Sequence, residues 1–440
     1  MMKFKNALLS LLLFAAILLT SCAQAPGTQS HIESQSTAVG TEEPTQAPAD
    51  PLWDLRKSDE AWISYGLAAY ESGKEIENLK DFFTNVNTLS YLTLYDHMFV
   101  FDKEKSISIA EALFSFIYNE YGADAVLDIE KRCEYKTAYL KSIGVDLEYI
   151  QDPKVESFFA SMEFSSNKTY QYIISFDNVT YYFKDFSAGT PAAYHGFLYY
   201  NTTGLFEMID YLKSNGLSEG LNTERDFQYF ATFDGSGISK TTYANGNMYI
   251  NDSMSALHEA IHAMGIGSAN SEHIWLSEGI CNYFGKVLGF NDQLAASYVQ
   301  ILTMTQQGAF DELASKGDQS AIIYQTIYEE YTTRGGKFDS IDTFDLGLYF
   351  DVGAKIELDM GVSSYVTLGE TYKKLNQKEC NSVGAELSYA QATSLITYLV
   401  KMHGIDRVLE AYKTQSTDVF GKTYEELKDL WLQYLQEPTA

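Results

Sequence analysis

The sequence predicts an α+β fold: a sheet followed by a long helical part, with an additional helical region before the sheet. Three observations predict it. In residues 52–159 the apolar side chains recur at helical spacing. In residues 169–250 short runs of aromatic and β-branched residues are separated by polar turns, as in strands. In residues 278–435 the pattern is again mostly helical.

The amino terminus predicts export. Lys3 and Lys5 precede a short apolar run at residues 7–19, and Leu-Thr-Ser-Cys then ends at Cys22. We therefore expect a signal peptide at residues 1–21, because an apolar segment that crosses a bilayer needs about 20 residues. The ending resembles the bacterial lipobox, which implies that Cys22 is lipidated and that the chain is anchored to the cell membrane outside the cytoplasm. The alternative is an ordinary cleaved signal.

The charge excludes some partners. The chain has 31 Lys+Arg against 59 Asp+Glu, and the exported part keeps 29 (31 minus the two lysines of the signal), so its net charge is −30. Nucleic acid and anionic membrane faces repel such a chain, so we expect no nucleic acid and contact with the membrane only through the lipid anchor. Residues 22–51 have almost no large apolar side chain and are expected to form a disordered tether.

Two further regions follow the tether. Residues 52–165 form the helical region, and residues 166–440 form one domain with a sheet half (166–252) and a helical half (253–440). The elements expected in the sheet half are strands at 170–176, 180–183, 227–233 and 248–250, and a helix at 204–213. Asn245-Gly246 is a hairpin signal before the last strand.

The helical region also contains an internal similarity. Residues 62–70 match residues 275–283, and residues 110–127 resemble residues 392–409. We interpret residues 52–165 as a possible degenerate repeat of the helical half. Tyr65 then stands where the second copy has Glu278, so the first copy could not hold a metal ion. The alternative is chance similarity between helices that end at glycine.

The chemistry is concentrated in His258-Glu259-Ala260-Ile261-His262, an HExxH motif. At 100° per residue, His262 lies about 40° from His258 on a helix, so both imidazoles project from one face. Glu259 lies at the edge of that face, where a carboxylate can act as a base without binding the metal. A different side of the same helix is apolar and carries Leu257, Ile261 and Met264.

Zinc needs a third protein ligand and an open position. Glu278 is the candidate, 16 residues after His262. It lies opposite an apolar stripe on its own helix, which is also typical of a solvated glutamate, but the loop after Gly265 is long enough to bring the two helices together. Cys133, Cys281 and Cys380 have no C-x-x-C spacing, which argues against zinc bound by cysteine and against a disulfide framework.

HExxH followed by W-L-x-E-G-x-x-x-Y resembles the gluzincin metallopeptidases, including the aminopeptidase-N-like and thermolysin-like families, and most of all the bacterial peptidase MA-like domains. The resemblance covers about residues 169–435. It implies a zincin-like domain, with a mixed sheet followed by the active-site helix and a helical C-terminal subdomain. It also implies Zn²⁺ bound by His258, His262 and Glu278, Glu259 as general base, and a peptide or protein substrate.

The sequence departs from related patterns at two places. Asn282 stands where thermolysin-like enzymes have an acidic residue that orients a zinc histidine; it can hydrogen-bond the ring but adds no charge. Residues 234–237 (DGSG) match the Gly-rich motif of aminopeptidases only weakly and read better as a turn.

Peptide hydrolysis also needs a donor for the oxyanion besides the metal. Tyr389 is the first candidate because it begins a helix that resembles those of the family; His195 and His273 are the others. Two different functions stay open at this point. One is a surface binding or adhesion module on a peptidase fold without turnover, and the other is a metal-dependent hydrolase of something other than peptides.

Overall fold

The computed structural model describes residues 52–58, 60–84, 86–94, 98–99, 102–147, 153–185, 191–233, 239–242, 245–266, 273–290, 292–369 and 389–436. The expected signal peptide, Cys22 and the tether lie outside the described residues. The chain divides between Met162 and Glu163 into two compact units, three residues before the expected boundary at 166. We call the first the helical unit and the second, which contains Glu163 and the residues after it, the sheet unit. No helix in the described ranges has the length and apolarity needed to span a membrane.

The helical unit is built around two helices that pack against each other. Its α-helices are α2 (Ala61–Ser72), α3 (Val86–Leu89), α5 (Lys103–Tyr121), α6 (Ala123–Leu127), α7 (Arg132–Ser142) and α8 (Pro153–Ala160). Helix α5 begins after Asp102, whose carboxylate accepts a hydrogen bond from the Lys105 amide at 3.2 Å, an N-cap. The helical periodicity predicted for this part of the chain is confirmed, and its apolar side forms the unit's core.

Each copy of the internal sequence similarity has a glycine that contacts a neighbouring helix closely, and the two contacts fall at corresponding positions of the match. A Cβ added to Gly66 in α2 would lie 2.2 Å from the Phe114 Cβ in α5, and one added to Gly279 would lie 2.5 Å from the Ile396 Cγ1. Phe114 and Ile396 occupy the same place in the sequence match. A duplicated helix pair would have this property, but no comparison tests the duplication, and it stays a prediction.

The position that would correspond to a metal ligand is occupied by an aromatic side chain in the helical unit. The Tyr65 ring stacks on Phe99, with 5.1 Å between the ring centroids. Among the described residues, the one group of His, Cys, Asp and Glu side chains that could hold a metal ion lies in the sheet unit.

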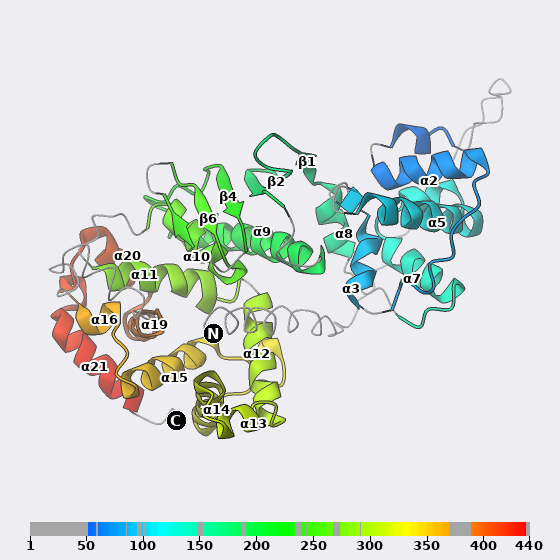
Figure 1. Ribbon diagram of the computed structural model, residues 1–440. Coiled ribbons are helices and arrows are strands. Elements are labelled where there is room, and N and C mark those ends of the chain that lie inside the picture. Colours follow the sequence, from blue (N-terminus) through cyan, green and yellow to red (C-terminus); the bar gives the residue numbers. More distant parts are fainter. Residues whose placement is uncertain are drawn as a thin grey trace, which may run out of the picture. The chain divides into compact units, whose positions relative to one another are not determined.

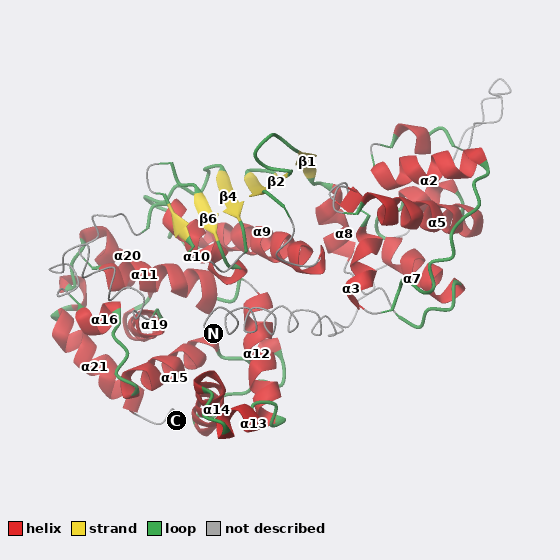
Figure 2. Ribbon diagram, viewed as in Figure 1, coloured by secondary structure: helices red, strands yellow, loops and turns green. Residues whose placement is uncertain are grey.

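The sheet unit contains a six-stranded sheet in the order β1-β2-β3-β4-β6-β5. The strands are β1 (Glu163–Ser165), β2 (Tyr172–Phe176), β3 (Val179–Phe183), β4 (Phe227–Ala231), β5 (Lys240–Thr241) and β6 (Met248–Ile250). The β3–β4 and β4–β6 pairs are parallel and the other pairs are antiparallel, so the sheet is mixed (Figure 2). The α+β class is confirmed.

One face of the sheet is covered by helices. In β2, β3 and β4 buried residues alternate with half-buried ones, as expected of a sheet with one face in the core. Helices α9 (Pro191–Ser214) and α10 (Ala256–Ala263) lie beneath the strands in Figure 1, and α10 contacts β4, β5 and β6. The HExxH motif therefore sits on a helix that is fixed against the sheet.

Two predictions for the sheet half were wrong in extent. Helix α9 begins at Pro191 instead of residue 204, and strands β1 and β5 were not predicted. Residues 201–204 (Asn-Thr-Thr-Gly) favour helix weakly, but Asn201 and Thr202 are buried and hydrogen-bond the Tyr181 hydroxyl at 2.8 Å each. Gly204 lies so close to the Phe290 carbonyl that a Cβ would be 2.2 Å from its oxygen. Tertiary contacts thus hold the helix continuous through a weak segment.

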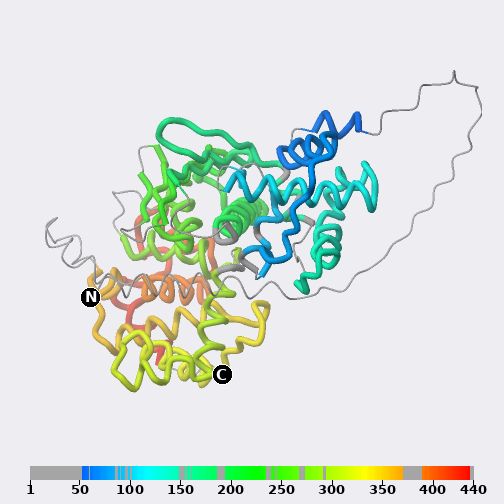
Figure 3. Tube along the Cα trace, turned by 45° about the vertical axis from the view of Figure 1, so that its right-hand side comes forward, coloured from blue at the N-terminus to red at the C-terminus, as the bar shows by residue number. Residues whose placement is uncertain are grey.

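The rest of the sheet unit is mostly helical, as predicted. Its longer elements are α11 (Ile274–Asn282), the π-helical turn η4 (Tyr283–Val287), α12 (Asp292–Gln306), α14 (Gln319–Thr333), α15 (Leu346–Asp359), α19 (Ala390–His403), α20 (Ile405–Thr414) and α21 (Tyr424–Gln436). Figures 1 and 3 show α12 to α15 at the opposite end of this unit from the sheet. Helices α10, α11 and α19 lie between the two ends.

Candidate metal centre

Helix α10 has the two-sided character that its sequence predicts. Leu257, Ile261 and Met264 are 0–1% exposed and pack into the core. The chain enters the helix through a short 3₁₀ turn, where the Asp252 carboxylate accepts a hydrogen bond from the Ser255 amide at 2.9 Å. Because the apolar side fixes the rotation of the helix about its axis, the two histidines point together to the other side.

Helix α11 and the π-helical turn η4 bring Glu278 to those histidines. Gly279 packs tightly against Ile396 of α19, and a Cβ on Gly285 would lie only 2.7 Å from the His258 amide nitrogen. Gly279 thus allows close contact with α19, and Gly285 allows close contact with α10. Glu278 is held between these two helices, and its side chain is only 16% exposed. It is therefore not a solvated glutamate, which its position opposite an apolar stripe also allowed.

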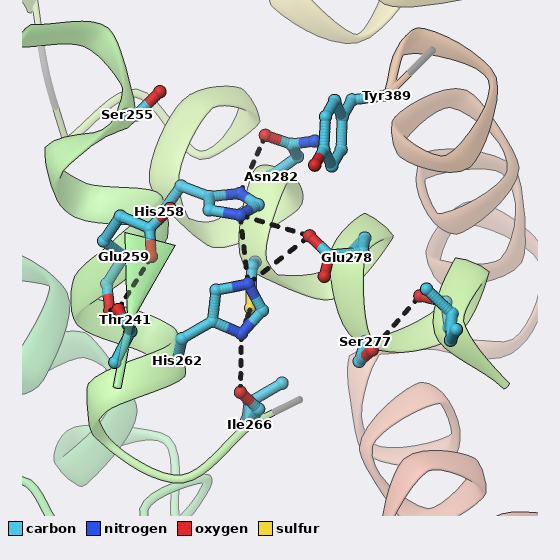
Figure 4. A network of polar contacts seen from close by, with 12 residues as sticks. Thr241, Ser255, His258, Glu259, His262, Ile266, Ser277, Glu278, Asn282 and Tyr389 are labelled. Carbon is cyan, nitrogen blue, oxygen red and sulfur yellow. Dashed lines mark hydrogen bonds and ion pairs between the residues drawn. The ribbon is translucent and has the colours of Figure 1, made fainter. Parts of the chain in front are cut away.

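Three ligand atoms converge at this point (Figure 4). The Nε2 atoms of His258 and His262 are 3.1 Å apart, and the Glu278 Oε2 lies 3.3 Å from the first and 3.4 Å from the second. All three side chains are largely buried, and together they could hold a metal ion. A tetrahedral zinc ion with bonds of about 2.0–2.2 Å separates its ligand atoms by about 3.3–3.6 Å, close to these distances.

The hydrogen bonds on the far side of each imidazole fix which nitrogen faces the centre. His262 Nδ1 lies 2.8 Å from the Ile266 carbonyl oxygen, which only accepts, so Nδ1 carries the proton. His258 Nδ1 lies 3.0 Å from the Asn282 Oδ1, which also only accepts, so this Nδ1 carries the proton too. Both rings therefore turn their Nε2 toward the Glu278 carboxylate. Two imidazole nitrogens and a carboxylate that face one point favour a positive charge between them, and a divalent metal ion fits this donor set.

The electrostatics of the cluster agree with a cation site. Burial raises the pKa of Glu278, but the neighbouring imidazoles lower it more, so the pKa stays well below its usual range and the carboxylate is charged. Burial raises the pKa of Cys281 to about 11, which keeps its thiol neutral at pH 7. The Cys281 Sγ lies 3.3 Å from His262 Nδ1 and packs behind that ring, away from the centre.

Glu259 and Tyr389 lie next to the three ligands without being part of the cluster. Glu259 is 4% exposed, and its carboxylate accepts a hydrogen bond from the Thr241 hydroxyl at 2.7 Å. The Tyr389 ring meets the edge of the His258 ring with 5.9 Å between centroids (Figure 4). Burial and the nearby Glu278 carboxylate raise the pKa of Tyr389, so its hydroxyl stays protonated and can donate.

Two polar side chains near the three ligands, Asn282 and Lys286, were not fully predicted from the sequence. Asn282 holds His258 as predicted, but its Nδ2 is buried and makes no hydrogen bond within the described residues. Lys286 follows one turn later in η4. Burial lowers the pKa of this ammonium below its ordinary value, and the nearby Asp252, Glu259 and Glu278 offset only part of that shift. It is a positive charge among carboxylates near the start of α10.

The other candidates lie elsewhere or outside the described residues. His195 is buried in α9, and His273 precedes α11 with its ring 6.1 Å from Trp275. The DGSG segment at residues 234–237 is not described. Sequence reasoning missed Thr241 because β5 is only two residues long, and it missed the Cys281 contact because nothing local marks that thiol.

Comparison of the chain with models of protein families, with curated proteins and with solved structures finds no match. The assignment of this centre therefore depends on its own geometry and on the motif.

Proposed function

We propose that this chain is a zinc-dependent peptidase with a zincin-like catalytic unit, exported and anchored to the cell membrane through a lipid on Cys22. The observation that carries the proposal is the convergence of His258 Nε2, His262 Nε2 and Glu278 Oε2 within 3.1–3.4 Å of one another. Two imidazoles and one carboxylate are a ligand set of catalytic zinc sites, which keep a fourth position open. The export signal and the lipobox-like ending support the location.

The neighbouring residues have the roles that peptide hydrolysis needs. A bound zinc ion would lower the pKa of a water molecule and polarise the scissile carbonyl. Glu259 accepts the proton of the attacking water and returns it to the leaving amine, for which a carboxylate close to the ligands but outside the cluster is suited. Tyr389 donates its hydroxyl hydrogen to the oxygen on which negative charge develops. Peptide or protein is the proposed substrate.

The test separates the base from the ligands. In Glu259→Gln the three ligands are intact, so zinc content should equal that of the wild type while cleavage of a peptide library is abolished. Zinc is measured by elemental analysis and cleavage by mass spectrometry on the same purified sample, with and without chelator. Equal turnover by the variant would remove Glu259 as the base, and a wild type that binds zinc but cleaves no peptide would contradict the proposed function.

A further inference from the structure

The Glu259 side chain is attached to the edge strand of the sheet. The Thr241 Oγ1 lies 2.7 Å from the Glu259 Oε2 and 2.9 Å from the Glu259 backbone oxygen. Figure 4 shows the two side chains together, on the other side of the imidazoles from Glu278. Thr241 is in β5, which pairs with β6 through Met248 and so belongs to the same sheet that supports α10.

Among the described residues, Thr241 is the one that holds this carboxylate. Within the described part of the chain, no other hydrogen bond or ion pair to the Glu259 carboxylate is found, and Glu259 is almost fully buried. A hydroxyl has a single hydrogen, and donation to a charged carboxylate is stronger than donation to a neutral carbonyl. The hydrogen is therefore directed to Oε2. Oε1 is left without a partner among the described residues.

We propose that Thr241 is the positioning residue of the general base. It fixes Oε2 so that the side chain keeps one rotamer, and it leaves Oε1 free to take a proton and return it. This inference rests on the proposed function, because the base has a role only if the centre hydrolyses a substrate. Thr241 itself touches neither the substrate nor the metal ligands in this role.

The prediction is a loss of rate without a loss of binding. Thr241→Val keeps the shape of the side chain but removes the donor, and a base that is misplaced by about 1 Å costs on the order of 10²-fold in kcat. KM and zinc content should stay as in the wild type, because neither depends on the orientation of the base. Thr241→Ser keeps the hydroxyl and should restore most of the rate.

The matched control is Thr180→Val. Thr180 is a half-buried threonine in β3 of the same sheet, and its hydroxyl lies 3.1 Å from the Ser175 hydroxyl. Its loss removes a comparable hydrogen bond far from the base in the sheet order. It should leave kcat unchanged, which separates a positioning effect from a general weakening of the sheet.

A second measurement does not depend on activity. Thermal unfolding of the wild type, Thr241→Val, Glu259→Ala and the double variant forms a double-mutant cycle. We expect the two losses of stability to be non-additive, since either change alone breaks the same contact. Additive losses, or a kcat for Thr241→Val equal to that of an active wild type, overturn the inference and leave the proposed function intact. A zinc-loaded wild type without turnover overturns both.

Discussion

Removal of the Glu278 carboxylate should weaken zinc binding far more than removal of any other glutamate. Its Oε2 lies within 3.4 Å of both imidazole nitrogens, so it supplies one of three protein ligands. Zinc binding to a structural site with four ligands is worth about 10–16 kcal/mol, or about 2.5–4 kcal/mol per ligand. Glu278→Ala should therefore raise the dissociation constant of zinc by about 10²–10³-fold.

The assay is a competition for zinc with a chromophoric chelator at pH 7. The matched control is Glu410→Ala in α20, whose side chain is 53% exposed and which lies on the surface of the same unit. Its zinc affinity should equal that of the wild type. An unchanged affinity in Glu278→Ala would mean that this carboxylate does not bind the metal, and the reasoning from the three converging atoms would be refuted.

Two further predictions concern the packing of the helices. Gly279→Ala places a Cβ 2.5 Å from the Ile396 Cγ1, so we expect it to lower the unfolding free energy by about 1–3 kcal/mol and to weaken zinc binding. Gly353→Ala, whose Cβ would lie 3.7 Å from its nearest neighbour, should change neither quantity. Equal melting temperatures and zinc affinities for the two variants would contradict this prediction. Burial raises the pKa of Asp351 from 3.8 to about 6. Between these two values the folded state holds a proton that the unfolded state releases, so the free energy of unfolding should fall as the pH rises from about 4 to about 6. The loss from this one carboxyl is up to ~3 kcal/mol. Chemical unfolding across that window should show the fall in the wild type and a flatter profile in Asp351→Asn; parallel profiles would contradict it.

The parts of the site that the sequence predicted are those set by helical phase. The spacing of His258 and His262 places both rings on one face, and the apolar side at Leu257 and Ile261 decides where that face points. Strands β2, β3, β4 and β6 and the helical end of the chain follow equally local patterns, because each of these elements carries its own periodicity.

The parts that could not be predicted depend on contacts between distant segments. The motif around Glu278 singles it out by resemblance, but its helical phase alone does not distinguish it from a solvated glutamate. The close packing at Gly279 and Gly285 does, and it requires α19 and α10 to be in place. Thr241 reaches Glu259 across 18 positions from a strand of two residues, too short to give a period. Helix α9 likewise continues through residues 201–204, which favour helix weakly, because those residues contact distant parts of the chain.

The most direct test of the metal centre is X-ray absorption at the zinc edge on the purified full-length protein, together with elemental analysis. We expect one zinc ion per chain, bound by two imidazole nitrogens and one carboxylate oxygen at about 2.0–2.2 Å. In His258→Ala and His262→Ala one imidazole should disappear from the coordination shell. A wild type that holds less than stoichiometric zinc, or zinc whose shell contains sulfur or no imidazole, would contradict the centre formed by His258, His262 and Glu278.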